Sequence, residues 1–246
     1  MRNYFVYNGV DSRDYGLYIS GTGRLKIPEK AYNFAEIPGR NGDLIVNASP
    51  RVRNDIIVYP AFLHQINTTG VPTTYDAQFS AMRSWLMSVR GYAELYDSYN
   101  CSHYRLAAFA GPVEPDVFQT LDAGSFDLEF NCKPQRYLVT TDDPITITQG
   151  SSHTFSVCGF KYSDPLITIN APGTFVVGDN VITVASVGPT FPVTIDCRLM
   201  ECYDAAMENM NSRVTFSNYN FPVIADGTIV TAQSTSLMID PRWYEL

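Results

Sequence analysis

The sequence predicts a mainly β protein with two domains in a row, and three observations support this. Aromatic residues make up 13% of the 246 residues, and they fit the half-buried surface of a pleated sheet. Short apolar segments alternate with turn-forming residues at roughly 8–12-residue intervals through the second half. A chain of this length is expected to form one or two domains, at about 150 residues each.

The first third is predicted to consist of strands separated by strong turns. A strand over residues 4–7 ends at Asn8-Gly9, and both residues tolerate the positive φ of a hairpin turn. A second strand is expected near residues 15–19. A dense group of turn formers at residues 37–43 then precedes a strand-like segment at 56–59.

One segment has helical spacing. Apolar residues recur there at three- and four-residue steps and share one face, namely Tyr75, Phe79, Met82, Trp85, Leu86 and Val89. Thr73, with Asp76 three positions on, resembles a capping box, and Gly91 ends the helix. Trp85 is interpreted as the core anchor of this helix, because a cofactor role would need polar partners nearby.

Further strands follow the helix, at 93–96 and 104–109. The segment 124–133 has the cleanest two-residue period in the chain, with Phe126, Leu128 and Phe130 on one face and charged or polar residues on the other. This strand is expected to have one buried side and one solvent-exposed side.

A domain boundary is predicted near residue 138, where turn formers coincide with a change in charge. Residues 1–138 hold 13 Lys and Arg against 14 Asp and Glu, a net charge of −1, whereas residues 139–246 hold 4 against 11, a net charge of −7. Regular short strand candidates after the boundary predict a β-sandwich over residues 139–246.

Composition also limits the function. A nucleic-acid-binding protein needs a cationic surface, which the acidic second half lacks. No apolar stretch approaches the ~20 residues of a membrane span, and no secretory signal is visible, so synthesis in the cytoplasm is expected. The five cysteines are an odd number without a CxxC pair, so neither a disulfide framework nor a zinc site is indicated. Cys197 and Cys202 could meet across a hairpin, but buried free thiols are favoured.

No catalytic or metal-binding pattern is apparent. Cys101 and His103 fall on one face of a strand, but no third group is placed to orient them as a nucleophile pair. A zinc site would need ligands from scattered positions, and the acidic pairs are interpreted as solvated loop charges. We therefore expect no enzyme activity, no cofactor and no metal.

The order of motifs in the first half resembles a known family. These motifs are Asn8-Gly9-Val10-Asp11-Ser12, Asp14-Tyr15-Gly16-Leu17, Ile37 to Leu44, Arg53-Asn54, Trp85-Leu86, Gly91 to Ser98 and Phe126 to Tyr137. Together they resemble the distal tail protein (Dit) family of long, non-contractile-tailed bacteriophages (siphoviruses) of Gram-positive hosts. The second half resembles the galectin-like β-sandwich of that family more loosely, through Val193 to Cys197, Tyr203-Asp204 and Asp240 to Trp243.

The resemblance implies a structural role in the virion. Proteins of this family form a hexameric ring through the N-terminal domain, here residues 1–138. The ring lies at the distal end of the tail and joins the tail tube to the tail-associated hub or lysin protein and the baseplate. The near-neutral, aromatic-rich first half fits ring contacts, and the acidic second half fits a solvated outward position.

Two interpretations of individual residues remain open. The cluster Pro38, Gly39, Arg40, Asn41, Gly42 and Asp43 is either a tight turn, with positive φ at its glycines, or a loop that contacts a neighbouring subunit through Arg40. The alternative function is a carbohydrate-binding module for host cell-wall polysaccharide. Its candidate aromatic platform consists of Tyr203, Tyr219 and Trp243.

Overall fold

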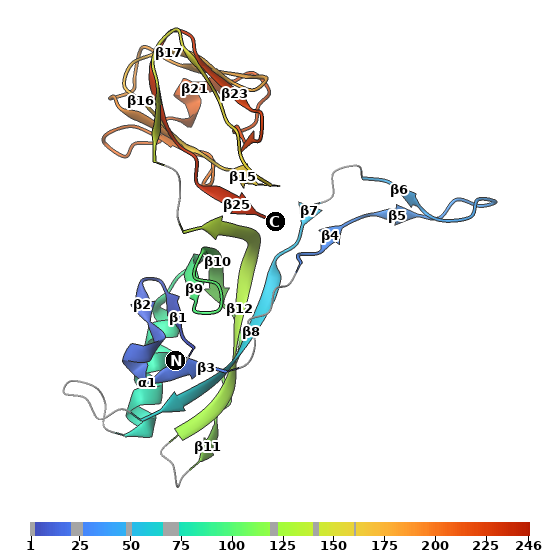
Figure 1. Cartoon of the computed structure of the whole chain (residues 1–246), viewed down its shortest axis with the longest axis vertical. Helices are drawn as coiled ribbons and strands as arrows, with labels where there is room; N and C mark the ends of the chain where they lie inside the picture. Colours follow the sequence, from blue (N-terminus) through green and yellow to red (C-terminus); the bar gives the residue numbers. More distant parts are fainter. Residues whose placement is uncertain are drawn as a thin grey trace. The chain divides into compact units, whose positions relative to one another are not determined.

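The computed structural model describes residues 3–20, 27–47, 51–65, 74–118, 123–139, 143–159 and 161–246. These residues form two compact units, the first extending from Met1 to Val139 and the second from Thr140 to Glu245. Within the described residues there is one α-helix among many short antiparallel strands (Figure 1), which confirms the mainly β fold class.

The described residues of the first unit form one α-helix, one 3-10 helix and strands that are mostly short, except for the long β8 and β12. In chain order they are β1 (Phe5–Tyr7), β2 (Val10–Asp11), the 3-10 helix η1 (Ser12–Tyr15), β3 (Leu17–Ile19), β4 (Lys30–Ala31), β5 (Phe34–Ala35), β6 (Leu44–Ile45), β7 (Arg51–Val52), β8 (Asp55–His64), α1 (Tyr75–Ser88), β9 (Ala93–Asp97), β10 (His103–Phe109), β11 (Asp116–Phe118) and β12 (Ala123–Leu138).

Six of these strands form a closed ring. The antiparallel order is β1-β9-β10-β12-β8-β3. The ring closes where Ile19 N donates to Asn3 O at 3.0 Å, because Asn3 directly precedes β1. Closure leaves few unpaired strand edges. Buried side chains on the inner face of β8 and β12 alternate with partly buried or exposed ones along both strands.

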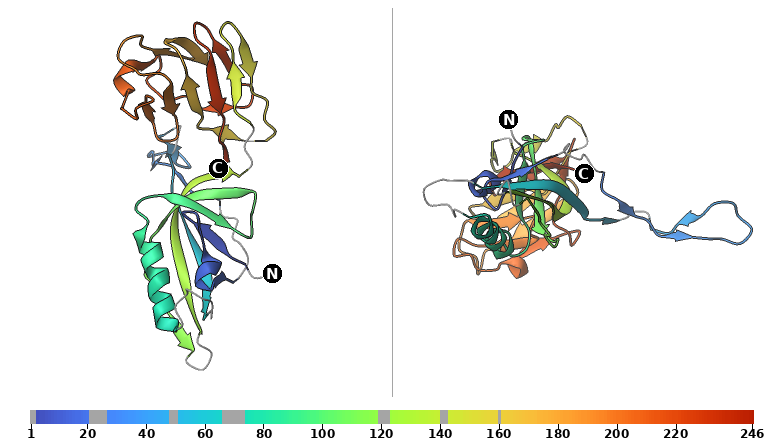
Figure 2. Two further views of the ribbon diagram at one scale, coloured as in Figure 1. Left: turned by 90° about the vertical axis from the view of Figure 1, so that its left-hand side faces the viewer. Right: turned by 90° about the horizontal axis from the view of Figure 1, so that it is seen from below.

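The helix α1 runs along one side of these strands (Figure 2, left) and buries the face that the sequence spacing predicts. Its N-cap differs from the expected one. Thr74, not Thr73, holds this position, and Thr74 Oγ1 accepts a hydrogen bond from Ala77 N at 3.3 Å. Thr73 itself lies outside the described residues.

Aromatic rings fill the space between α1 and the strands. Trp85 stacks on Tyr15 at 4.9 Å and on Phe5 at 5.8 Å between ring centroids. Phe5 also meets the edge of Phe130 from β12 at 5.7 Å. Such pairs each add about 1 kcal/mol beyond the area that they bury. Trp85 therefore lies at the centre of the first unit's core, on the helix side.

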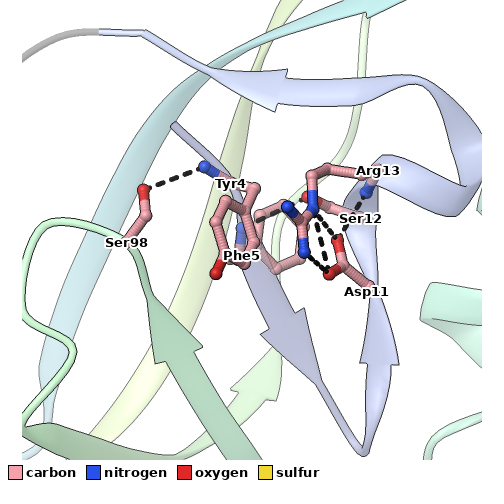
Figure 3. Close-up of polar contacts among 6 residues, drawn as sticks. All are labelled: Tyr4, Phe5, Asp11, Ser12, Arg13 and Ser98. Atoms are coloured by element: carbon pink, nitrogen blue, oxygen red, sulfur yellow. Dashed lines mark hydrogen bonds and ion pairs between the residues drawn. The ribbon is translucent and has the colours of Figure 1, made fainter. Parts of the chain in front are cut away.

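Polar contacts fix the N-terminal strand to its neighbours (Figure 3). Ser98 Oγ accepts from Tyr4 N at 3.0 Å, and the buried Ser12 Oγ accepts from Phe5 N at 3.2 Å. The Arg13 guanidinium forms a fork with the Asp11 carboxylate and lies 3.7 Å above the centre of the Tyr4 ring. Hydrogen bonds and an ion pair thus hold the Asn8-Gly9 hairpin and the following residues 11–13 together.

Gly124 allows the Tyr75 side chain to approach β12 closely. A Cβ atom at Gly124 would lie 2.1 Å from Tyr75 Oη and 3.2 Å from Asp116 O. The Tyr75 hydroxyl is buried with no hydrogen-bond partner, and this burial raises the pKa of Tyr75. Any side chain at position 124 therefore requires the Tyr75 side chain to shift.

The second unit contains strands of two to five residues. In chain order its elements are β13 (Ile145–Ile147), β14 (Ser152–Thr154), β15 (Tyr162–Ser163), β16 (Leu166–Ile169), β17 (Gly173–Val177), β18 (Asn180–Val184), β19 (Val193–Asp196), β20 (Glu201–Tyr203), the 3-10 helix η2 (Asn211–Arg213), β21 (Val214–Phe216), β22 (Ile224–Ala225), β23 (Ile229–Ala232), β24 (Leu237–Asp240) and β25 (Trp243–Glu245).

These strands form two antiparallel sheets of five strands each, β13-β24-β16-β19-β20 and β14-β23-β17-β18-β21. Each sheet buries one row of side chains and exposes the other, as the two layers of a sandwich do. Outside these two sheets, β15 pairs with both β22 and β25.

A buried ion pair joins β19 to the start of β25. Arg242 donates to both carboxylate oxygens of Asp196, at 2.8 and 3.2 Å, and to Asp164 O at 3.0 Å. Burial alone would raise the pKa of Asp196, but the hydrogen bonds and charge of Arg242 outweigh it and hold this pKa below its ordinary value. The pair is therefore charged throughout the neutral range.

The five cysteines fall into two groups. Cys132, Cys197 and Cys202 are buried, and burial raises the pKa of Cys132 and of Cys202 to about 12 each and raises that of Cys197 as well. Cys101 in the first unit and Cys158 in the second are exposed. All five are free thiols.

We expect Gly124→Ala to lower the free energy of unfolding by about 2 kcal/mol, because the new methyl group collides with the Tyr75 ring. Urea unfolding followed by circular dichroism measures this change. Tyr75→Phe alone should be near neutral, since it removes a hydroxyl without a partner, and added to Gly124→Ala it should restore part of the loss. Equal losses in the single and double variants would contradict the proposed collision.

We expect Arg242→Met to cost about 3 kcal/mol at pH 7, because it leaves the Asp196 carboxylate buried and unpaired. The folded-state pKa of Asp196 is depressed, so the stabilisation is present above the ordinary carboxyl pKa and is lost as the pH falls through the folded value. The difference between wild type and variant should therefore shrink below about pH 4. Urea unfolding at pH 7 and pH 3 measures it, and a difference independent of pH would contradict the role of Asp196.

Candidate functional site: the arm

The arm consists of residues 27–47 together with Arg51 and Val52. Two short ladders follow one another along a single hairpin (Figure 1). In the first, β4 pairs with β7 through Lys30 and Val52. In the second, β5 pairs with β6, with Phe34 opposite Ile45. The turn-forming cluster found in the sequence closes the second ladder.

The Asn47 side chain links the two edges of the hairpin where neither ladder runs. Its Oδ1 accepts from Asn33 N at 2.7 Å, and its Nδ2 donates to Ala31 O at 3.0 Å. Val46 N donates to Asn33 O at 2.9 Å. Between the β4-β7 ladder and the β5-β6 ladder, the Asn47 amide therefore supplies the hydrogen bonds that join the two edges of the hairpin. These bonds keep the hairpin in one register.

The base of the arm is bound to the strand ring. Asn54, between β7 and β8, donates through Nδ2 to Tyr92 Oη at 2.6 Å and to Asn131 Oδ1 at 2.8 Å. Lys133 Nζ lies 5.2 Å from the centre of the Tyr92 ring. The Arg53-Asn54 motif, which the sequence resemblance included, thus fixes the point at which the arm leaves β8.

The arm exposes many apolar side chains. Six of them are among the exposed large hydrophobic residues of the first unit, and Phe34 for example is 61% exposed. They are Ile27, Tyr32, Phe34, Leu44, Ile45 and Val46. A two-stranded hairpin is marginally stable in water by itself, and soluble proteins seldom leave apolar residues clustered at the surface. The arm therefore has the chemistry of an interface.

The predicted cluster from Pro38 to Asp43 lies at the tip, and all six of its residues are exposed. Gly39 and Gly42 have φ values of 80° and 84°, and no other atom would contact a Cβ at either position. Arg40 N donates to Ile37 O at 3.2 Å, which closes a turn. The loop is thus both a glycine-dependent turn and an accessible surface, so the two interpretations are compatible.

The three residues considered as a sugar platform do not lie together. Tyr203 is partly buried on β20, in one sheet, whereas Tyr219 follows β21 in the other sheet and is 94% exposed. Trp243 belongs to β25 and is buried, with its ring 6.0 Å from that of Phe155. The expectation for Trp243 is therefore wrong: it is a core residue and has no free face for a sugar ring.

The described residues contain no metal-binding cluster. Among them, no group of three His, Cys, Asp or Glu side chains could hold a metal ion. Cys101 Sγ points to Ser98 O at 3.7 Å, while His103 Nδ1 is 2.8 Å from Ser102 Oγ. The described part of the chain contains no helix long and apolar enough to cross a membrane.

The tip of the arm is predictable from the sequence, whereas the exposure of its apolar flanks is not. Phe34, Leu44 and Ile45 have the composition of ordinary buried strand residues, so nothing in their identity indicates exposure. A usable signal was the shortness of the apolar segments on either side of the turn cluster, since a short two-stranded hairpin is only marginally stable by itself in water.

Solved structures with the same fold are phage tail proteins. The chain resembles the structure described as SPP1 Dit (gp 19.1), a paradigm of the hub adsorption apparatus in Gram-positive infecting phages, with a TM-score of 0.70 and 12% identity over 100% of this chain and 99% of the other. It also resembles chains of the phage p2 baseplate in its activated conformation with Sr (TM-score 0.59, 10% identity, 100% and 99% coverage) and with Ca (0.54, 10%, 98% and 98%). No protein-family model and no curated protein matches the sequence. The fold predicted from the resemblance is thus the fold observed.

We expect trypsin to cut the free chain first after Arg40, because the tip is exposed and its backbone makes few hydrogen bonds. Mass spectrometry of early digestion products identifies the site, and Arg40→Gln should remove this first cut. Initial cleavage within α1, at Arg83, would show that the helix opens more readily than the arm and would contradict this description.

Proposed function

We propose that this protein is a distal tail protein, a non-enzymatic subunit at the distal end of a siphovirus tail. The observation that carries this proposal is the likeness to the SPP1 Dit structure, which covers 100% of this chain and 99% of the other. Likeness at 12% identity concerns the fold, and function depends on sites placed on a fold. The arm supplies such a site.

The proposed assembly is a homo-hexameric ring formed by the first unit. In a ring with cyclic symmetry each subunit uses two different surfaces, one to reach its neighbour and one to receive it. The arm fits the reaching surface, because it exposes six large apolar side chains on a narrow hairpin. Burying such side chains contributes about 1.5 to 3 kcal/mol each, which compensates for ordering the hairpin.

The ring would connect the tail tube to the tail-associated hub or lysin protein and the baseplate. These partners come from the family resemblance, and an aromatic-rich, nearly neutral first half supports extensive contacts of this kind. We place the protein in the virion, after synthesis in the host cytoplasm. The role needs no cofactor and no direct nucleic-acid binding.

We expect the purified protein to have about six times the 27.5 kDa mass of one chain in light scattering. Phe34→Ser combined with Val46→Ser should shift it to monomers at the same concentration. These monomers should keep the circular dichroism spectrum of a folded chain, because both side chains are exposed in the single chain. Leu199→Ser is a matched control, since Leu199 in the second unit is 60% exposed.

This experiment can fail in two informative ways. Wild-type protein that stays monomeric across a wide concentration range, with no rings in negative-stain images, would contradict the ring. Rings that persist in the double variant would leave the ring intact but remove the arm from its interface. In that case Arg40→Ala and Gly42→Val should also leave assembly unchanged, and the tip would be only a turn.

A second candidate function, binding of host cell-wall polysaccharide by the second unit, is favoured by one observation. Tyr219 is almost fully exposed at a position with φ of 60°, a conformation that costs a bulky residue about 1 kcal/mol or more. An exposed aromatic held in this way is a suitable contact for a sugar ring.

A further inference from the structure

One sheet of the second unit contains no charged residue of the Asp, Glu, Lys or Arg type in any of its strands. This sheet is β14-β23-β17-β18-β21, whose residues are all described. The unit around it is acidic, with a net charge of −7 over residues 139–246. The other sheet carries Asp196, Glu201 and Asp240 in its strands. The acidic residues of the unit thus lie outside the strands of the β14-β23-β17-β18-β21 sheet, although one side of that sheet faces solvent.

The solvent side of this sheet is rich in hydroxyl groups. Because side chains alternate along a strand, the residues between the buried ones form this surface, which we name the hydroxyl face. It consists of Ser152, Thr154, Thr174, Val176, Val181, Thr183, Thr215, Ile229 and Thr231.

The hydroxyl groups are aligned across the strands. Ser152 Oγ lies 2.9 Å from Thr231 Oγ1, and Thr174 Oγ1 lies 3.2 Å from Thr183 Oγ1. A hydroxyl offers one donor and two acceptor positions, so each pair retains hydrogen-bonding capacity for a ligand. Six hydroxyls against three aliphatic side chains make this surface too polar for a typical apolar protein contact.

The loop that carries Tyr219 is attached to the edge of the same sheet. It follows β21 directly, and Ser217 N donates to Val181 O at 3.0 Å while Ser217 Oγ accepts from Val181 N at 2.9 Å. The buried Asn180 amide donates to Asn220 O at 2.8 Å and accepts from Ser217 Oγ. Asn220 N donates to Asn218 Oδ1 at 3.1 Å. The loop is therefore held in one conformation, with its aromatic side chain exposed.

We propose that the hydroxyl face, with Tyr219 at its edge, binds a neutral polysaccharide. This inference rests on the second candidate function and names its surface and its ligand class. Sugar hydroxyls can exchange hydrogen bonds with the serine and threonine hydroxyls, and the tyrosine ring can contact the apolar face of a sugar ring. The surrounding negative charge repels polyanions such as teichoic acids, whereas a neutral chain meets no charge on this sheet.

The test is affinity electrophoresis of the full-length protein in native gels that contain dextran, hydroxyethyl cellulose, galactan or mannan, or the polyanion polygalacturonate. At least one neutral polymer should slow the wild-type protein, and polygalacturonate should not. Tyr219→Ala should weaken the interaction about tenfold, as expected for loss of one aromatic contact. Val181→Lys, which places a long charged side chain in the face, should abolish it.

Matched variants make the outcome specific. Met238→Lys is the control for Val181→Lys, because Met238 lies on the outer side of the other sheet and the two side chains are 40% and 39% exposed. Met207→Ala is the control for Tyr219→Ala, since Met207 is also exposed and has φ of 63°. Relative to its own mobility in a polymer-free gel, each control should be retarded as strongly as the wild type.

Three results would overturn the proposal. They are no retardation by any neutral polymer, equal effects of Val181→Lys and Met238→Lys, and a change of oligomeric mass in Val181→Lys with retardation unchanged. The last would identify the face as a contact between copies of the chain. Phe34→Ser with Val46→Ser should still be retarded, so failure of ring assembly and failure of sugar binding are distinguishable.

Discussion

Strand β12 is the element on which the first unit depends, because it is long enough to pair along both of its edges. Its residues 123–132 pair with β8, and its residues 130–132 and 136–138 pair with β10 on either side of an irregularity. Positions 130–132 therefore have partners on both sides. This double pairing sets the register of the whole strand ring. It also places Phe130 beneath the rings that surround Trp85 and places Asn131 beside Asn54, at the base of the arm. The core on one face and the arm's attachment on the other thus depend on the same strand.

The parts of the fold that follow from local periodicity were predictable. The two-residue alternation around Phe130 indicates which side of β12 is buried, and the spacing around Trp85 indicates the face of α1 that packs. Both patterns depend only on residues that are close together in the sequence. The shift of the N-cap from Thr73 to Thr74 is a one-residue error of the kind that capping patterns allow, because adjacent threonines offer the same hydroxyl.

Features that arise from distant contacts were not predictable. From its sequence Trp243 is as suitable for a surface platform as for a core, because aromatic residues occur in both. Its burial follows from the tertiary packing of β25. The exposure of Phe34 and the absence of charge on the hydroxyl face are also tertiary properties. The first requires knowing that the arm has no core beneath it, and the second requires knowing which five strands, far apart in sequence, lie side by side.

The two groups of cysteines have a practical consequence for spectroscopy. Thiolates are the reactive form, so the buried Cys132, Cys197 and Cys202, whose pKa values burial raises, remain unreactive at neutral pH. Cys101 and Cys158 are exposed, with one in each unit. The native chain therefore carries a ready pair of attachment points for spin labels or fluorophores. Without any engineered cysteine, such labels would report the separation of the two units in the free subunit and within an assembled tail.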